Sequence, residues 1–181
     1  MSRALFVLLA VALGIASLAN AGTIAITGAN GESCIFACPG DVVPLKLVYT
    51  GEPAIGSFDV ILAPPFGSVG NVAIAAGNRQ TDYDYISDMG GGAYEVSASN
   101  ADTALTTVGG ALATFTLTVP VTATAADSFL FSPAVFGDVL YGAGMVPMSG
   151  YDIGGAQINI IPEPATMLLL GLGGLLFARK K

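Results

Sequence analysis

The middle of the chain alternates apolar and polar residues, which is the pattern of strands with one buried face. Between Val42 and Thr50 every second residue is apolar, and Lys46 falls on the opposite side. From Ala111 to Val119 apolar residues alternate with threonines, and Pro120 ends the run. Each of these stretches is therefore expected to bury one face and to leave the other in solvent.

Shorter stretches of the same character recur along the chain, separated by turns rich in Gly and Asp. Strands are expected at Thr23–Thr27, Phe58–Leu62, Val69–Ala75, Tyr83–Ile86, Ala93–Ala98, Ser128–Phe131 and Gln157–Ile161. The stretch Val72–Ala76 is also compatible with a short helical or irregular crossover. Apart from the two ends, no long stretch shows the 3.6-residue period of a helix. The pattern predicts an all-β domain, an antiparallel sandwich of two sheets.

The first 21 residues have the layout of a secretory signal peptide, with an N-terminal signal helix. Arg3 gives a basic start and an apolar stretch follows, after which Ala19 and Ala21 fit the small-x-small rule of signal peptidase. The pattern predicts cleavage that leaves Gly22 as the first residue. No cysteine stands at the cleavage site, so a lipoprotein is not expected. An uncleaved N-terminal anchor is the alternative.

Residues 162–181 combine three features in a fixed order. Pro162, Glu163 and Pro164 come first, an apolar run follows, and Arg179, Lys180 and Lys181 end the sequence. The prolines disfavour helix before them, so an apolar helix is expected to begin only after the second proline. The fourteen residues of this run, from Ala165 to Ala178, reach about 21 Å at about 1.5 Å each, which makes a short span for a hydrocarbon core of about 30 Å. The terminal cations favour the cytoplasmic side.

This tail is similar to the PEP-CTERM sorting signal of bacteria that export surface and matrix proteins. The resemblance implies that an exosortase processes the chain at Pro162, Glu163 and Pro164, after a transient stay of the short helix in the inner membrane. An ordinary C-terminal anchor that stays in place is the alternative. The expected destination is the cell envelope, the cell surface or the extracellular matrix.

Residues 22–161 have the size of one domain. They contain twelve acidic and two basic residues, a net charge of −10. Such a surface repels phosphate backbones, so nucleic acid is not expected as a partner.

The order of strands in this domain resembles that of the cohesin-like jelly roll. The resemblance spans about Pro39 to Ser132 and is carried by the segments Pro39–Leu45, Ile55–Val60 and Gly110–Leu117. It departs at Ala63, Pro64 and Pro65, where cohesin-like chains often carry an Asp-Pro pair. Cohesins bind dockerin modules, and the scaffold also resembles that of carbohydrate-binding modules. Both a surface protein and an exopolysaccharide are therefore open as partners.

Cys34 and Cys38 are the only cysteines. In an oxidising exterior they are expected to form a local disulfide. Their C-x-x-x-C spacing, without a strand–helix unit, argues against a redox motif. Two thiolates in a chain without histidine would leave a zinc site half empty.

The absence of histidine also removes the Ser-His and Cys-His nucleophile pairs, so an enzyme is not expected. Paired carboxylates remain the only candidates for a small glycan-active site, and they are Asp82 with Asp84, Asp88 or Glu95. Asp82, Asp84 and Asp88 are also candidate ligands for calcium if a bent loop gathers them, although the EF-hand pattern is absent. No other cofactor is expected. The simpler interpretation is a polar edge strand kept soluble by its aspartates.

Tyr83, Tyr85 and Tyr94 are candidates for an aromatic platform that stacks on sugars. Half-buried packing is the simpler role for alternating tyrosines. The sequence as a whole predicts an exported β-sandwich that acts by binding, as a structural or adhesive component of exopolysaccharide or biofilm. A cohesin-like protein-binding module is the alternative.

Overall fold

The computed structural model describes residues 22–51, 54–75, 83–100, 105, 110–138, 140–142, 144–148 and 150–162. The expected signal helix with Ala19 and Ala21 lies outside these residues, as does the expected C-terminal helix. So do Glu163, Pro164, Arg179, Lys180 and Lys181. Within the described part, no helix has the length and apolar character needed to cross a bilayer.

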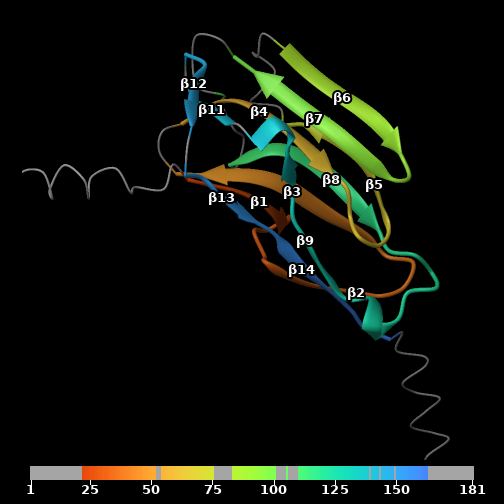
Figure 1. The fold of residues 1–181 in the computed structure, drawn as a ribbon. Coiled ribbons are helices and arrows are strands. Elements are labelled where there is room, and N and C mark those ends of the chain that lie inside the picture. The colour runs from red at the N-terminus through yellow and green to blue at the C-terminus, as the bar shows by residue number, and fades with distance from the viewer. Residues whose placement is uncertain are drawn as a thin grey trace, which may run out of the picture.

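The described residues form strands and two short 3-10 turns, η3 and η4 (Figure 1). In chain order these elements are β1 (Thr23–Gly28), β2 (Cys34–Ala37), β3 (Val42–Thr50), β4 (Ile55–Leu62), β5 (Ser68–Ile74), β6 (Tyr83–Gly90), β7 (Ala93–Ser99), β8 (Ala111–Thr118), η3 (Ala125–Asp127), β9 (Phe129–Phe131), β10 (Ala134–Val135), η4 (Phe136–Asp138), β11 (Leu140–Gly142), β12 (Val146–Met148), β13 (Asp152–Gly154) and β14 (Ala156–Ile160).

These strands make two large sheets and one small sheet. Sheet I has the order β13-β1-β3-β8-β5, and sheet II has the order β12-β11-β4-β7-β6, with β10 also paired to β4. The small sheet has the order β2-β14-β9. The pairs β1–β13 and β2–β14 are parallel, while the ladders that join β3, β4, β7 and β8 to their neighbours are antiparallel. Figure 1 shows sheets I and II as two layers, with the small sheet at the end where β2 and β14 lie. The predicted all-β sandwich is confirmed.

One core fills the space between the two layers. Leu47 of β3 and Val60 of β4 are fully buried, and Phe58 of β4 is 1% exposed. Burying a side chain of this size stabilises the fold by about 1.5–3 kcal/mol. The ring of Phe115 in β8 meets that of Phe131 in β9 nearly at right angles, with centroids 6.0 Å apart. This contact joins the small sheet to the same core.

The strands with clean alternation were predicted correctly. The predicted strand Val42–Thr50 coincides with β3, and the threonines of β8 alternate with buried apolar residues as expected. The stretch that begins at Val72 is mostly strand, but β5 is irregular there. Its register shifts between Gly70 and Ala73, and Asn71 has a φ of 50°.

Candidate functional site

The candidate site is the outer face of sheet II, the side turned away from the core. Along β4, Phe58 and Val60 point inward, so Ser57 and Asp59 point outward. Cross-strand partners share a face of a sheet, and the ladders extend this face over β7, β6 and β11. The outward residues that these ladders place in rows are Ser57 with Ser99, Tyr83 and Tyr141, Asp59 with Ser97 and Tyr85, and Ile61 with Glu95 and Ser87.

A short turn overhangs this face and hollows it. β10 pairs with β4 at Val60 and Ile61, and β11 pairs with the same strand at Ile55 and Ser57. The intervening turn η4 leaves the ladder beside Asp59, and it is the short cyan turn next to β4 in Figure 1. Gly137 at its centre has a φ of 66°, a conformation that favours glycine.

Beneath this turn lies a depression of about 320 Å³. Its lining combines two serines, a carboxylate and two aromatic rings, and the lining residues are Ser57, Asp59, Ser97, Phe136, Gly137 and Tyr141. We call it the Asp59 depression. Phe136 remains 58% exposed, so its ring is open to a ligand as well as to solvent.

Asp59 is the chemically unusual residue of this depression. Its Oδ1 atom is buried and has no hydrogen-bond partner. Burial raises the pKa of the Asp59 carboxyl above its ordinary value, and the negative charge of Glu95 on β7 raises it further. A buried acceptor without a donor costs free energy, so the site favours a ligand that brings a donor.

Two of the three predicted platform tyrosines lie together on the outer face. The rings of Tyr83 and Tyr85 are stacked with centroids 6.1 Å apart and an interplanar angle of 16°. They are 49% and 39% exposed. Tyr94 pairs with Leu62, on the inner side of the sheet, and packs against the core. The prediction of a three-ring platform is therefore wrong for Tyr94, because alternation along β7 turns it inward.

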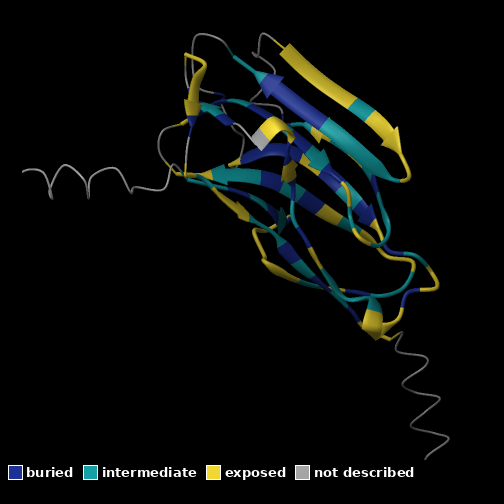
Figure 2. Cartoon of the chain, viewed as in Figure 1, coloured by how far each residue is buried: buried dark blue, intermediate teal, exposed yellow. Residues whose placement is uncertain are grey.

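The predicted carboxylate group does not come together among the described residues. β6 is an extended edge strand, exposed along most of its length in Figure 2, so the Cα atoms of Asp84 and Asp88 lie about 13 Å apart. Asp88 accepts a hydrogen bond from the backbone N–H of Gly90 at 2.8 Å. Asp84 pairs with Ala98 and Ser87 pairs with Glu95, which places Asp84 and Glu95 on opposite faces.

Asp82, the third predicted calcium ligand, lies outside the described residues. Within the described ranges, no group of three or more His, Cys, Asp or Glu side chains could hold a metal ion. The interpretation of this segment as a polar edge strand agrees with its exposure and its place at the end of sheet II.

The predicted disulfide between Cys34 and Cys38 is wrong in this structure, where both thiols are free. The reason is that the intervening residues form strand β2, paired in parallel with β14. Four extended residues span about 13 Å, whereas a disulfide needs Cα atoms within about 7 Å. The Cys34 sulfur instead accepts a hydrogen bond from the Asn159 side chain at 3.2 Å.

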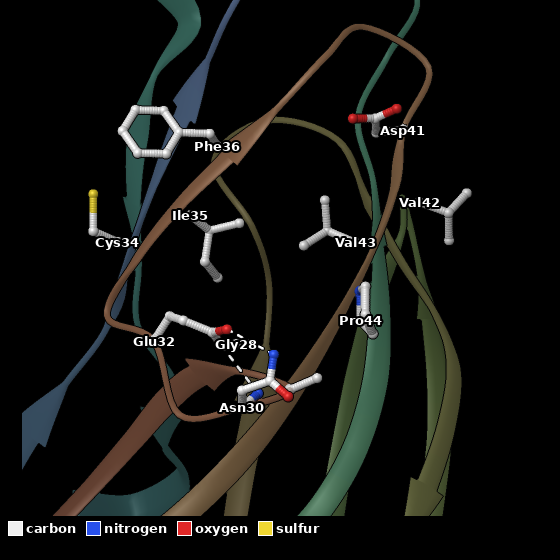
Figure 3. A pocket seen from close by; sticks show the side chains of 11 residues that line it. Gly28, Asn30, Glu32, Cys34, Ile35, Phe36, Asp41, Val42, Val43 and Pro44 are labelled. Carbon is white, nitrogen blue, oxygen red and sulfur yellow. Dashed lines mark hydrogen bonds between the residues drawn. The ribbon is translucent and has the colours of Figure 1, made fainter.

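A second depression of about 520 Å³ lies beside β2 and the start of β3 (Figure 3). Ile35 and Val43 form much of its apolar wall. Glu32 accepts hydrogen bonds from the backbone N–H and the side-chain amide of Asn30, at 3.0 and 2.8 Å, and these bonds lower the pKa of its carboxyl. Asp41 accepts one from the backbone N–H of Cys38 at 2.7 Å. These carboxylates stabilise turns, so this depression is the weaker candidate despite its size.

The comparisons bear on the tail and on the fold separately. Residues 161–181 match the PEP-CTERM protein-sorting motif. The tail is a PEP-CTERM sorting signal. It indicates export and association with the envelope. No curated protein matches the sequence.

Among solved structures, the domain is similar to cohesin modules. A type III cohesin from a cell-surface anchoring scaffoldin of Ruminococcus flavefaciens has a TM-score of 0.57 and 14% identity, over 80% of this chain and 91% of that one. A non-cellulosomal cohesin from Archaeoglobus fulgidus has a TM-score of 0.54 and 15% identity, over 82% of this chain and 96% of that one. A chain of a type I cohesin–dockerin complex from Clostridium thermocellum has a TM-score of 0.57 and 16% identity, over 78% of this chain and 100% of that one. At such identities the likeness shows a cohesin-like fold.

Sequence reasoning missed the Asp59 depression. Ser57 and Asp59 interrupt an apolar strand with polar residues, which is a signal that any half-solvated strand gives. Ser97, Phe136 and Tyr141 join them only through the pairing of β4 with β7 and β11, which the sequence does not specify.

Proposed function

We propose that this protein is a non-catalytic binding module of the cell surface or extracellular matrix, and that it binds exopolysaccharide on the outer face of sheet II. Signal peptidase removes the N-terminal segment, and an exosortase processes the tail after a transient stay in the inner membrane. The protein then serves a structural or adhesive role in biofilm.

The stacked pair of Tyr83 and Tyr85 is the observation that carries the choice of ligand. Two nearly parallel rings, each about half exposed, stand next to each other on one face of an edge strand. Aromatic rings of this kind stack on the apolar faces of pyranoses and need little reordering to do so. Around them the face carries hydroxyls, from Ser97, Ser99 and Tyr141, which suit a hydroxyl-rich ligand.

The charge of the domain supports a neutral polymer as ligand. Twelve acidic residues against two basic ones would repel a strongly anionic chain at low ionic strength. Sugar hydroxyls, in contrast, can donate hydrogen bonds to carboxylates and serines on this face.

A protein partner is the second candidate. The fold is similar to that of cohesin modules, one of which is described in a type I cohesin–dockerin complex. Ile86 and Met89 on β6 are exposed and offer apolar contact area for such a partner. Ile86 pairs with Val96 on the inner side of the sheet, so such a partner would contact the β6 edge rather than the outer face that carries the two tyrosines.

Affinity electrophoresis of the exported protein in gels that contain the host's purified exopolysaccharide tests the proposal. We expect the polymer to retard the wild-type protein, and Tyr85→Ala or Tyr83→Ala to weaken binding about five- to tenfold. Phe36→Ala is the matched control, because it removes an exposed ring from the small sheet. If the wild type runs unretarded, exopolysaccharide is not the ligand. If the tyrosine variants bind as well as the wild type, the ligand lies elsewhere.

A further inference from the structure

The Asp59 depression contains a hydrogen-bond acceptor that the fold itself leaves unsatisfied. Oδ1 of Asp59 is buried without a donor, although Ser97 stands directly opposite across the β4–β7 ladder. The lining gathers residues from β4, β7, β11 and η4, so four separate segments of the chain converge on it. A carboxylate that is kept partly dry and unpaired in the lining of a hollow is poised for a ligand that donates.

The surrounding groups indicate what kind of donor fits. Ser57, Ser97 and Tyr141 each carry a hydroxyl, which donates and accepts. A ligand cation would use the acceptors alone and leave the hydroxyl protons unpaired, whereas a sugar with neighbouring hydroxyls matches donors and acceptors together. The ring of Phe136, open on one side, supplies an apolar wall for the face of a pyranose.

The size and position of the depression relate it to the tyrosine pair. A hollow of about 320 Å³ has room for one sugar ring with some water, not for a length of polymer. Asp59 and Tyr85 lie in one row across the sheet, with only Ser97 between them. Two strand spacings separate them by about 10 Å, so a polysaccharide that leaves the depression across the strands reaches the tyrosine rings within about two sugar units.

We propose that the Asp59 depression is a subsite for one neutral sugar unit, which it holds through two adjacent hydroxyls. One sugar hydroxyl donates to Oδ1 of Asp59, and the next exchanges hydrogen bonds with Ser57 or Ser97, while the ring packs against Phe136. This inference rests on the proposed function, since it assigns a second contact to the same polysaccharide. Asp59 and Glu95 both carry negative charge, so the subsite discriminates against uronic acids.

Binding measurements with defined polymers test this subsite. The probes are the host exopolysaccharide, a neutral mannan, a neutral β-glucan and alginate, a polyuronate. The variants are Asp59→Asn and Ser97→Ala. Asp88→Asn is the matched control, because it removes the same charge from the exposed edge strand.

We expect Asp59→Asn to weaken binding of the neutral ligand about tenfold and Ser97→Ala several-fold, since a hydrogen bond to a charged group is lost or weakened. Asp88→Asn should bind as the wild type does, and alginate should bind more weakly than the neutral polymers.

The outcomes separate this inference from the proposed function. If Tyr85→Ala loses binding while Asp59→Asn and Ser97→Ala do not, the sugar subsite is wrong and the proposed function stands. Tighter binding of alginate than of neutral polymers also overturns the subsite. If the wild type binds none of the four polymers, both proposals are wrong. Loss of a host protein partner in Asp59→Asn would assign the carboxylate to a protein hydroxyl instead.

Discussion

Asp59 of β4 faces Ser97 of β7 across an antiparallel ladder, yet its Oδ1 atom is buried without a hydrogen bond. The turn η4 lines the same depression as this pair, and Ser97 is only 9% exposed although it lies on an outward face. A sheet face that ought to be fully solvated is thus partly dry at one point. Asp59 therefore offers this outer face a buried hydrogen-bond acceptor without a donor.

This arrangement predicts that Asp59 destabilises the folded protein at neutral pH. The pKa of its carboxyl is raised in the folded state, so the charged form is penalised at pH values above that pKa. The free-energy penalty for the charged form decreases as the pH falls through the folded-state pKa. It is absent below the pKa of the unfolded state. Asp59→Asn should therefore raise stability at pH 7 by about 0.5 kcal/mol, a small gain because the group is still partly hydrated.

Chemical unfolding of both proteins at several pH values measures this effect. The two proteins should differ at pH 7 and converge below about pH 3, where the carboxyl is protonated in both states. Asp88→Asn, on the exposed edge strand, is the control and should not gain stability over the wild type at pH 7, because Asp88 accepts a hydrogen bond from the Gly90 backbone. An Asp59→Asn variant that is less stable than the wild type at pH 7 would contradict the account of the unpaired oxygen.

The turn between β4 and β5 gives a second prediction. Gly67 has a φ of 94°, and a Cβ atom added there would lie 2.6 Å from the carbonyl oxygen of Thr118. Gly67→Ala should cost about 2–4 kcal/mol, because backbone strain and a clash with backbone add together. Gly31 has nearly the same φ, 93°, with no atom within 4 Å of the added Cβ, so Gly31→Ala should cost about 1 kcal/mol. An equal loss of unfolding free energy in the two variants, measured by chemical denaturation, would show that the Thr118 contact is absent.

A third prediction concerns the cysteines. Since β2 holds Cys34 and Cys38 apart, both thiols should be alkylated in the denatured protein without prior reduction. Cys34 is exposed and should react before Cys38 in the folded protein. Mass spectrometry after alkylation counts the modified thiols. A protein that takes up no alkyl group until it is reduced would show that the bond forms after all.

Sequence alternation predicted the large strands because their burial is periodic. In β3 the buried residues Leu45 and Leu47 flank Lys46, and in β8 buried residues alternate with threonines from Ala113 to Thr118, so the apolar positions repeat with the period of a strand. The strands β10 to β13 have two or three residues each, too few for any period, and they form because partner strands offer free edges. The strand β2 was not predicted because Cys34 at its start and Cys38 just after its end suggested a closed loop rather than an extended segment.

The candidate site was predictable only in part. Tyr83 and Tyr85 were found because neighbours two apart in a strand share a face. The prediction for Tyr94 was wrong because the sequence does not show which residues of β7 point toward the core and which point away from it. The Asp59 depression depends on the register between β4, β7 and β11 and on the path of η4, and none of these is fixed by local sequence.

Processing of the two ends gives a fourth prediction. The PEP-CTERM motif covers 161–181, and Pro162 is the last described residue. Protein recovered from the host's envelope and medium should start at Gly22 and stop near Pro162, as shown by intact mass and C-terminal peptide mapping. A chain that still ends at Lys181 would mean that the tail is a retained anchor.

Retention in the extracellular matrix tests the central claim most directly. The host would carry a chromosomal copy with both Tyr83→Ala and Tyr85→Ala, next to a Phe36→Ala control, and the protein would be quantified in washed matrix and in cell-free medium. The account predicts that wild type and control stay with the matrix polysaccharide while the double variant is released into the medium. Equal retention of the double variant and the wild type would contradict the assignment of the outer face of sheet II as the polysaccharide-binding surface.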